Sequence, residues 1–322
     1  DSVPEQTTQI IALMKLFILK ATVFLAIFLG FFAIEEIVFR SIPNNVSYKY
    51  EYLTDNASNI KILILGSSIE EDGIRPSQFK VPTFNAAISA KPPEKDHAIL
   101  LHFWEQFDSL QVLIMPLSYF SLHHNDTSSQ VEYVNYITRT DLDINPKPIR
   151  NYSAMLTYQP HVVHRNVMRK IRDPQYTHIT VDTLGWDRFG ESFGALSPEE
   201  KLQNATFYAR NNNQKCNNDT LRNLQYYQEI IELCQERNVT VLLLSVPMTD
   251  LFINAIDTSQ LNYVRSKGRY FSEHYSNVVY LDMFQSPLFD YSDFGNVNHL
   301  NPKGAEKFTA ILDSIIENHI LN

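Results

Sequence analysis

Short apolar runs recur along the chain between longer polar stretches. Such runs are typical of strands that are buried on both faces of a parallel sheet. They occupy Ile62–Leu65, Val112–Met115, Val239–Leu244 and Val278–Leu281, and Phe84–Ile88 is a candidate for a further short strand. We therefore expect a central sheet whose strands come from the whole length of the chain after residue 60.

Segments with helical periodicity alternate with these runs. Their apolar residues recur every three or four positions, which places them on one stripe of a helix. The segments are Glu94–Phe107, Thr220–Glu236, Asp257–Tyr275 and Pro302–Asn318. Strands that alternate with helices predict an α/β fold in three layers, with a mainly parallel sheet as in flavodoxin-like folds.

A much longer apolar segment, Leu16–Ile34, lies near the N-terminus and contains a single charge, Lys20. A helix needs roughly 20 apolar residues to cross a bilayer, so residues 1–40 are predicted to form a transmembrane anchor. Lys15 and Lys20 stand at its N-terminal end, and the positive-inside rule then puts the rest of the chain outside the cytoplasm, in the periplasm or the extracellular space. A cleaved signal peptide and a buried core helix are the alternatives.

The chain after the anchor divides into three parts. Residues 41–60 are polar and rich in turn formers, and they are predicted to form a stalk. Residues 61–322 are predicted to form the α/β domain, interrupted at about 121–218 by an insertion of helices and loops. We expect this insertion to lie over the carboxyl edge of the sheet, where open α/β sheets bind their ligands.

Composition narrows the range of functions. The chain has 322 residues and a net charge of −9, which argues against a nucleic-acid partner. Its two cysteines, Cys216 and Cys234, do not imply a disulfide framework, although a single bridge remains open. No motif has the spacing of metal ligands, so neither a metal nor another cofactor is predicted.

Two motifs carry candidate chemistry. Gly66-Ser67-Ser68 directly follows the first predicted strand, where a tight turn exposes a serine hydroxyl. Asn296-Val297-Asn298-His299 precedes the terminal helix. A histidine can accept a proton from a serine if the fold brings the two side chains together. Each motif alone has an ordinary interpretation, a glycine-serine turn in one case and a surface histidine in the other.

The combination resembles the SGNH, or GDSL-like, hydrolases. In that family a strand ends in a turn that carries the nucleophile, and a late loop carries the base. The block ILILGSS is similar to the first and puts Ser68 at the nucleophile position, while NVNHLNPKGAEKF puts His299 at the base position. The segments GSSIEEDGIRPSQF, FNAAIS and VLIMPLSYFSL resemble the membrane-anchored branch, which includes a protein of teichoic acid D-alanylation and the alginate O-acetyltransferases.

The chain departs from the family at the acid position. The family has its acid three residues before the histidine, and this chain has Asn296 there. Asparagine can orient an imidazole but cannot balance the charge of an imidazolium, and loss of the acid costs a serine triad roughly 10⁴ in turnover. Asp293 is the nearest alternative, although it stands six residues before His299.

The family's oxyanion blocks are also altered. The glycine of the second block is replaced within Asn85-Ala86-Ala87-Ile88-Ser89, and the asparagine of the third block has no match near Ser118. Backbone N–H groups need no particular side chain. The candidate oxyanion and substrate-binding residues are Gly66, Ser67, Ala87, Ser89 and Ser118.

Several other polar residues have two interpretations each. Glu70-Glu71-Asp72 is either a solvated helix start or a cation site. Trp186 either stacks on a sugar or packs in the interior. His161 and His164, and the loop group of His123, His124 and Asp126, are either exposed or part of a larger site.

Two hypotheses follow. The resemblance implies an extracytoplasmic O-acyl esterase or acyltransferase that modifies a cell-surface glycan through a serine acyl-enzyme, often with a multi-pass membrane acyltransferase as partner. The altered residues favour the alternative, a catalytically degenerate domain that binds glycan or scaffolds a membrane complex.

Overall fold

The computed structural model describes residues 3–123, 153–157, 160–190, 192–213 and 220–321. The chain forms two compact units. The first contains residues 1–43 and 147–178, and the second contains residues 44–146 and 179–322.

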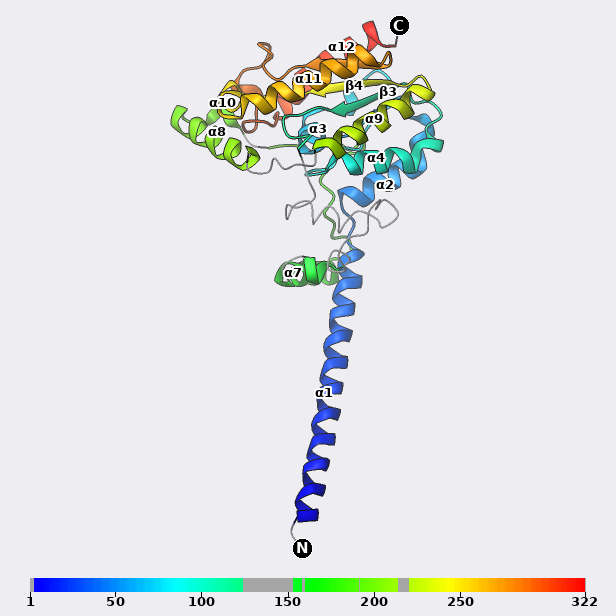
Figure 1. Cartoon of the computed structure of the whole chain (residues 1–322), viewed down its shortest axis with the longest axis vertical. Coiled ribbons are helices and arrows are strands. Elements are labelled where there is room, and N and C mark those ends of the chain that lie inside the picture. Colours follow the sequence, from blue (N-terminus) through cyan, green and yellow to red (C-terminus); the bar gives the residue numbers. More distant parts are fainter. Residues whose placement is uncertain (1–2, 124–152, 158–159, 191, 214–219, 322) are drawn as a thin grey trace. The chain divides into compact units, whose positions relative to one another are not determined.

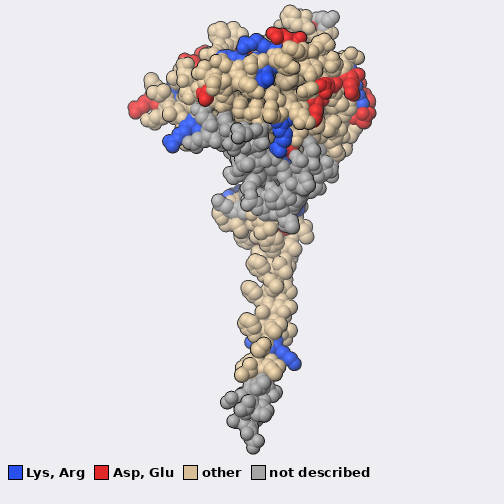
Figure 2. All heavy atoms as spheres, viewed as in Figure 1, with Lys and Arg blue, Asp and Glu red and all other residues tan. Residues whose placement is uncertain are grey.

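The first unit is built on one long helix, α1 (Val3–Arg40). Its segment Gln9–Arg40 is long and apolar enough to cross a membrane. The side chains of residues 9–31 are all exposed, as a lipid-facing helix requires. Figure 2 shows uncharged surface along α1 beyond the lysines near its N-terminal end. Two shorter helices, α6 (Ala154–Thr157) and α7 (Pro160–Arg172), contact α1.

The second unit contains a sheet of five parallel strands (Figure 1). In chain order they are β1 (Ile62–Ile64), β2 (Thr83–Asn85), β3 (Val112–Pro116), β4 (Thr240–Ser245) and β5 (Val278–Asp282). Four coincide with the predicted apolar runs, and Thr83–Asn85 overlaps the fifth. The predicted α/β class with a parallel sheet is confirmed.

The strand order is β2-β1-β3-β4-β5, so the direction of winding reverses after β1. Strand β2 lies on one side of β1 and every later strand lies on the other. Such a reversal opens a crevice at the carboxyl ends of the two strands involved, β1 and β3. The topology therefore places the residues that follow β1 at a natural binding position.

Helices connect and cover the strands. They are α2 (Asn45–Asn56), α3 (Ser68–Gly73), α4 (Pro93–Phe103), α8 (Pro198–Asn213), α9 (Thr220–Glu236), α10 (Asp250–Ala255), α11 (Thr258–His274) and α12 (Pro302–His319). Short 3₁₀ turns occupy η1 (Ala57–Asn59), η2 (Pro76–Gln78), η3 (Trp104–Gln106), η6 (Phe193–Ala195) and η7 (Tyr291–Asp293). Helix α4 packs against α9, and α3 packs against α12.

The predicted stalk at residues 41–60 is not a stalk. It contains α2, which Asn44 caps and whose residues Val46 and Leu53 belong to the hydrophobic core. Tyr52 stacks on Phe84 of β2 with ring centroids 4.0 Å apart. The apolar positions are spaced for one helix face, but polar neighbours conceal this pattern in the sequence.

The predicted insertion at 121–218 is divided between the two units. Its described residues before Ile179 include α6 and α7 of the first unit. Residues after that point carry α8, which packs against α10 in the sheet-containing unit. Residues 124–152 lie outside the described part of the chain.

Candidate functional site

The turn after β1 is fixed by a glycine and a buried carboxyl group. Gly66 has a φ of +131°, and a side chain at this position would overlap Glu70 Oε2. Glu70 Oε2 accepts hydrogen bonds from the backbone N–H and the hydroxyl of Ser67. The turn therefore ends the strand sharply and begins α3 at Ser68.

The loop that carries His299 is held at both ends. Asn301 caps α12 by accepting the Gly304 N–H, and its amide donates to the carbonyls of Ser292 and Phe294. Phe294 and Leu300 form a β-bridge that closes the loop. Gly304 lies so close to the carbonyl oxygen of Asp293 that a Cβ would approach it to 2.0 Å. The Asn301-Pro302-Lys303-Gly304 motif thus sets the conformation of the loop.

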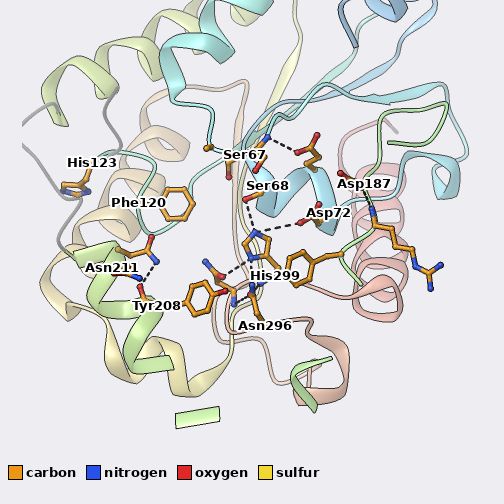
Figure 3. Close-up of a pocket in the computed structure, with 17 residues that line it drawn as sticks. Ser67, Ser68, Asp72, Phe120, His123, Asp187, Tyr208, Asn211, Asn296 and His299 are labelled. Atoms are coloured by element: carbon orange, nitrogen blue, oxygen red, sulfur yellow. Dashed lines mark hydrogen bonds and ion pairs between the residues drawn. The ribbon is translucent and has the colours of Figure 1, made fainter. Parts of the chain in front are cut away.

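These two elements bring Ser68 and His299 together. The distance from Ser68 Oγ to His299 Nε2 is 2.9 Å, although the residues are 231 positions apart in the sequence (Figure 3). The pair lies at the carboxyl end of β1, where the winding of the sheet reverses. This distance is within the range for a nucleophile and its general base.

Two asparagines determine the tautomer of the imidazole. Asn296 Oδ1 accepts the backbone N–H groups of Asn298 and His299, which identifies this atom as the oxygen. The ring Nδ1 of His299 lies 3.1 Å from it and 3.0 Å from Asn298 Oδ1. Nδ1 is therefore the protonated nitrogen, and Nε2 presents its lone pair to the Ser68 hydroxyl.

His299 is partly buried, and one face of its ring is covered by an aromatic side chain. Its ring stacks on Phe189 at a centroid distance of 5.0 Å. Burial lowers the pKa of His299 from its ordinary value of 6.5 to about 4. The imidazole is therefore neutral at physiological pH and can accept a proton.

A carboxyl group lies on the serine side of the imidazole. Asp72 Oδ2, from α3, is 4.0 Å from His299 Nε2. Burial, and then the negative charges of Glu71 and Asp187, raise the pKa of Asp72 from 3.8 to about 8. The sequence offered no reason to choose Asp72 over Glu70 and Glu71, because the three acidic residues stand side by side after the serine turn.

The carboxylate of Asp293 binds two lysines, whereas the sequence suggested it as an alternative to the missing acid beside His299. Its carboxylate accepts Lys307 Nζ at 2.8 Å and lies 3.1 Å from Lys303 Nζ. It also accepts the backbone N–H of Asp290. The lysines hold the pKa of Asp293 below its ordinary value even though burial opposes them. Asp293 thus stabilises the start of α12, while the asparagines contact the imidazole.

Several of the candidate oxyanion residues already form hydrogen bonds within the protein. The Ala87 N–H donates to Asn85 Oδ1, and the Ser89 N–H donates to Glu71 Oε2. The Gly66 N–H donates to Asp96 Oδ1. Ser118 Oγ lies 2.6 Å from Ser121 Oγ. The backbone N–H of Ser68, in the first turn of α3, has no intrahelical acceptor and is the best-placed donor beside the nucleophile.

The acidic segment after Ser68 is not a solvated helix start, because Glu70, Glu71 and Asp72 are all buried. Lys49 of α2 forms an ion pair with Glu71 at 2.8 Å and donates to the carbonyl of Ala87. Full burial lowers the pKa of Lys49 even beside this carboxylate.

A second buried ion pair joins Lys91 to Asp96 at 2.6 Å. Lys91 also donates to the carbonyl of Ala86. Buried pairs of this kind lose much stability when one partner is removed.

The serine and the histidine open into a cleft of about 580 Å³. Most of its lining residues carry polar side chains, and the lining also includes two phenylalanine rings and one tyrosine ring. The cleft residues are Ser67, Ser68, Glu71, Asp72, Ser89, Ala90, Phe120, His123, Asp187, Arg188, Phe189, Tyr208, Asn211, Asn212, Asn296, Asn298 and His299. Figure 3 shows α8 contributing Tyr208 and Asn211 opposite Ser68.

A scan against protein-family models finds no match to the chain. A search of curated proteins finds no relative either. The chemistry of the cleft is therefore argued from its geometry.

Trp186 is 8% exposed and donates from its indole nitrogen to the carbonyl of Asp72 at 2.7 Å, so it packs beneath the site. His164 lies in the first unit, 2.6 Å from Glu35. Cys234 is a buried free thiol, whereas Cys216, His124 and Asp126 lie outside the described residues. Within the described residues no cluster of side chains could hold a metal ion.

Proposed function

We propose that the chain is a serine O-acyl esterase or acyltransferase of the SGNH type, with its α/β domain outside the cytoplasm. The observation that carries the proposal is the 2.9 Å distance between Ser68 Oγ and His299 Nε2 in an open cleft. We also propose that helices cover both faces of the parallel sheet, which gives three layers. Lys15 and Lys20 at the N-terminal end of α1 favour a cytoplasmic N-terminus, which places the α/β domain on the other side of the membrane.

The reaction proceeds through an acyl-enzyme. Ser68 Oγ attacks the acyl carbonyl carbon while its proton moves to His299 Nε2. The tetrahedral intermediate then collapses, and the leaving oxygen takes this proton. In the second half, His299 removes a proton from water or a sugar hydroxyl as the oxygen attacks the acyl-enzyme, and this proton then passes from His299 to Ser68 Oγ as the acyl group leaves.

Asp72 supplies the negative charge that the asparagines lack. Asn296 and Asn298 accept the Nδ1–H but remain neutral when the imidazole becomes protonated. The carboxyl group of Asp72 lies 4.0 Å from Nε2, on the side where the proton arrives. When it is ionised, it stabilises the imidazolium by a Coulomb attraction that is strong in a buried site.

A glycan is the substrate class that the cleft fits best. The amide group of Asn211 and the hydroxyl of Tyr208 offer hydrogen bonds to sugar hydroxyls. The rings of Phe120 and Phe189 offer flat apolar faces. We also propose that a multi-pass membrane acyltransferase supplies the acyl group.

A second candidate function is a degenerate domain that binds glycan or scaffolds a membrane complex. Two observations favour it. The acid of the triad is replaced by Asn296, and the N–H groups of Ala87 and Ser89 are already bound within the protein. An oxyanion would then rely on the Ser68 N–H and on donors that the substrate itself brings.

A fluorophosphonate probe distinguishes the two functions. We expect the full chain in detergent to react at Ser68, with loss of fluoride and transfer of the serine proton to His299. Ser68→Ala should abolish labelling, and His299→Ala should slow it by roughly 10³-fold or more. Labelled residues would be identified by peptide mass spectrometry.

Ser67→Ala is the matched control, because Ser67 neighbours the nucleophile but faces Glu70. It should retain most of the labelling. Absence of labelling in a folded wild-type chain, or equal labelling of Ser68→Ala, would reject the enzyme in favour of the binding domain.

A further inference from the structure

The apolar segment of α1 has the length of a bilayer's hydrocarbon core and ends at Ile34. The run Leu16–Ile34 is 19 residues long, which spans roughly 28 Å at 1.5 Å per residue. This length matches a hydrocarbon core of about 30 Å. Glu35 and Glu36 follow directly, so they mark the boundary between the hydrocarbon and the headgroup layer.

Helices α6 and α7 are attached to α1 at this boundary. Glu36 accepts hydrogen bonds from the Ser153 hydroxyl and the Ala154 N–H, at the start of α6. Glu35 is 2.6 Å from His164 Nδ1 of α7, and His164 also contacts the ring of Phe31. Figure 1 shows α7 beside the C-terminal part of α1. These contacts hold α7 at the depth of lipid headgroups.

The charge of α7 contrasts with that of the whole chain. Its sequence, PHVVHRNVMRKIR, contains four basic residues and no acidic residue. The complete chain has a net charge of −9. A basic helix in an acidic protein indicates a local anionic partner rather than a general feature of composition.

Three of the four basic residues of α7 form one exposed stripe together with His161, while Lys170 lies elsewhere and donates to the carbonyls of Pro174 and Tyr176. At 100° per residue, His161, Arg165, Arg169 and Arg172 fall within a sector of roughly 80°. All four are exposed. The buried residues Val163, Asn166 and Val167 lie on the other side of the helix. Within the stripe, Arg169 contacts the hydroxyl and the ring of Tyr176, and the buried residues that attach α7 to its unit lie outside the stripe.

We propose that this stripe binds the anionic headgroups of the membrane that α1 crosses. Basic side chains held at a membrane surface gain roughly 1 kcal/mol each from anionic lipid. The exposed side chains of Leu156 and Ile171 provide an apolar margin for shallow insertion, as in interfacial helices. The binding fixes α7 on the bilayer and does not depend on the proposed chemistry of the cleft.

A lipid-quenching experiment on the full chain tests the proposal. Ile171→Cys, in a Cys216→Ser background, would carry a fluorophore, while the buried thiol of Cys234 is left in place. The protein is reconstituted into phosphatidylcholine vesicles that contain either phosphatidylglycerol or phosphatidylcholine with a spin label near the headgroup. We expect roughly tenfold stronger quenching by the anionic lipid, and loss of this preference in about 0.5 M NaCl.

Charge variants complete the test. Arg165→Gln/Arg169→Gln/Arg172→Gln should remove the preference for phosphatidylglycerol, and Arg165→Gln alone should reduce it about fivefold. A control variant removes three positive charges from α8 and α11 and should leave the preference unchanged; its substitutions are Arg210→Gln/Lys267→Gln/Arg269→Gln. Equal quenching by both lipids in the wild type would overturn the proposal and point to a protein partner. An unchanged preference in the α7 triple variant would overturn it as well.

Discussion

At the scale of single residues, the neutrality of His299 controls the chemistry of the site. Its Nδ1–H is bound by two amide oxygens, and its Nε2 faces Ser68. With a pKa of about 4, the ring is a weak base that needs help to hold a proton. The only carboxyl group within 4.0 Å of its nitrogens, among the residues the structure describes, belongs to Asp72.

Asp72 should therefore control the pH dependence of acylation. Its pKa is raised to about 8, so its carboxyl group is protonated below that pH and ionised above it. Because the ionised form stabilises the imidazolium, the labelling rate of Ser68 should rise as pH increases through about 8. Asp72→Asn should abolish this rise and lower the rate at pH 9 by roughly tenfold or more.

Asp187→Asn provides a directional check on the same assignment. The charge of Asp187 helps to raise the pKa of Asp72, so its removal should move the rise in rate to lower pH. A fluorophosphonate rate profile measured from pH 5 to 10 records both effects. A profile that is identical in the wild type and Asp72→Asn would exclude Asp72 from the reaction.

Sequence reasoning found Ser68 and His299 because each stands in a recognisable block at the end of a predicted element. It could not find Asp72 or Phe189. Asp72 reaches the imidazole only because α3 turns it back toward the loop before α12, and Phe189 comes from a segment with no periodic pattern. Long-range contacts of this kind leave no local signal in a single sequence.

At the scale of elements, the loop and first turn of α12 form one rigid support for His299. Gly304→Ala should destabilise the chain by about 1–3 kcal/mol, because the new Cβ would lie 2.0 Å from the carbonyl oxygen of Asp293. The expected loss in Tm is about 2–4 °C per kcal/mol, measured by thermal unfolding in detergent.

Gly190→Ala is the control for this substitution, since no atom lies within 4 Å of a Cβ at that position. Its Tm should stay within about a degree of the wild type. If Gly304→Ala proves equally harmless, the close packing of α12 on the Asp293 carbonyl does not constrain the loop.

Buried strands and long helices were the elements that the sequence predicted well. Thr220–Glu236 has the predicted bounds, and the other three predicted helices differ mainly at their ends. Helix α2 was missed, and the burial of α3 was missed, for a common reason. Each buries charged residues, Lys49 in one case and Glu70, Glu71 and Asp72 in the other, where the hydrophobic pattern suggests solvent.

At the scale of the whole molecule, buried ionisable groups set the pH range of stability. Burial raises the pKa of Glu70 to about 8, and its Oε1 has no hydrogen-bond partner among the described residues. A raised folded-state pKa means that the stabilising contribution is complete below about 4.5 and is lost as pH rises through about 8. His299 has the opposite effect on the pH dependence of stability. Because its pKa is lowered, the folded state loses stability as pH falls from 6.5 to about 4.

The Tm of the wild type should therefore decrease between pH 6 and pH 9. Glu70→Gln removes one group whose pKa is raised, and it preserves the shape of the side chain. The Tm of this variant should therefore decrease by several degrees less than the wild-type Tm over the same pH range. Thermal unfolding of the full chain in detergent, at fixed ionic strength, measures the difference. Parallel curves for the two proteins would show that Glu70 is not protonated in the folded state.

Helix α2 decides where a soluble fragment of this protein can begin. Truncation at residue 61, the boundary that composition alone recommends, would delete Lys49 and leave Glu71 as an uncompensated anion behind the cleft. The ring of Phe84 would also lose its covering tyrosine, Tyr52. A crystallisable domain that lacks α1 should therefore start at Asn44, so that the capped helix stays with the sheet.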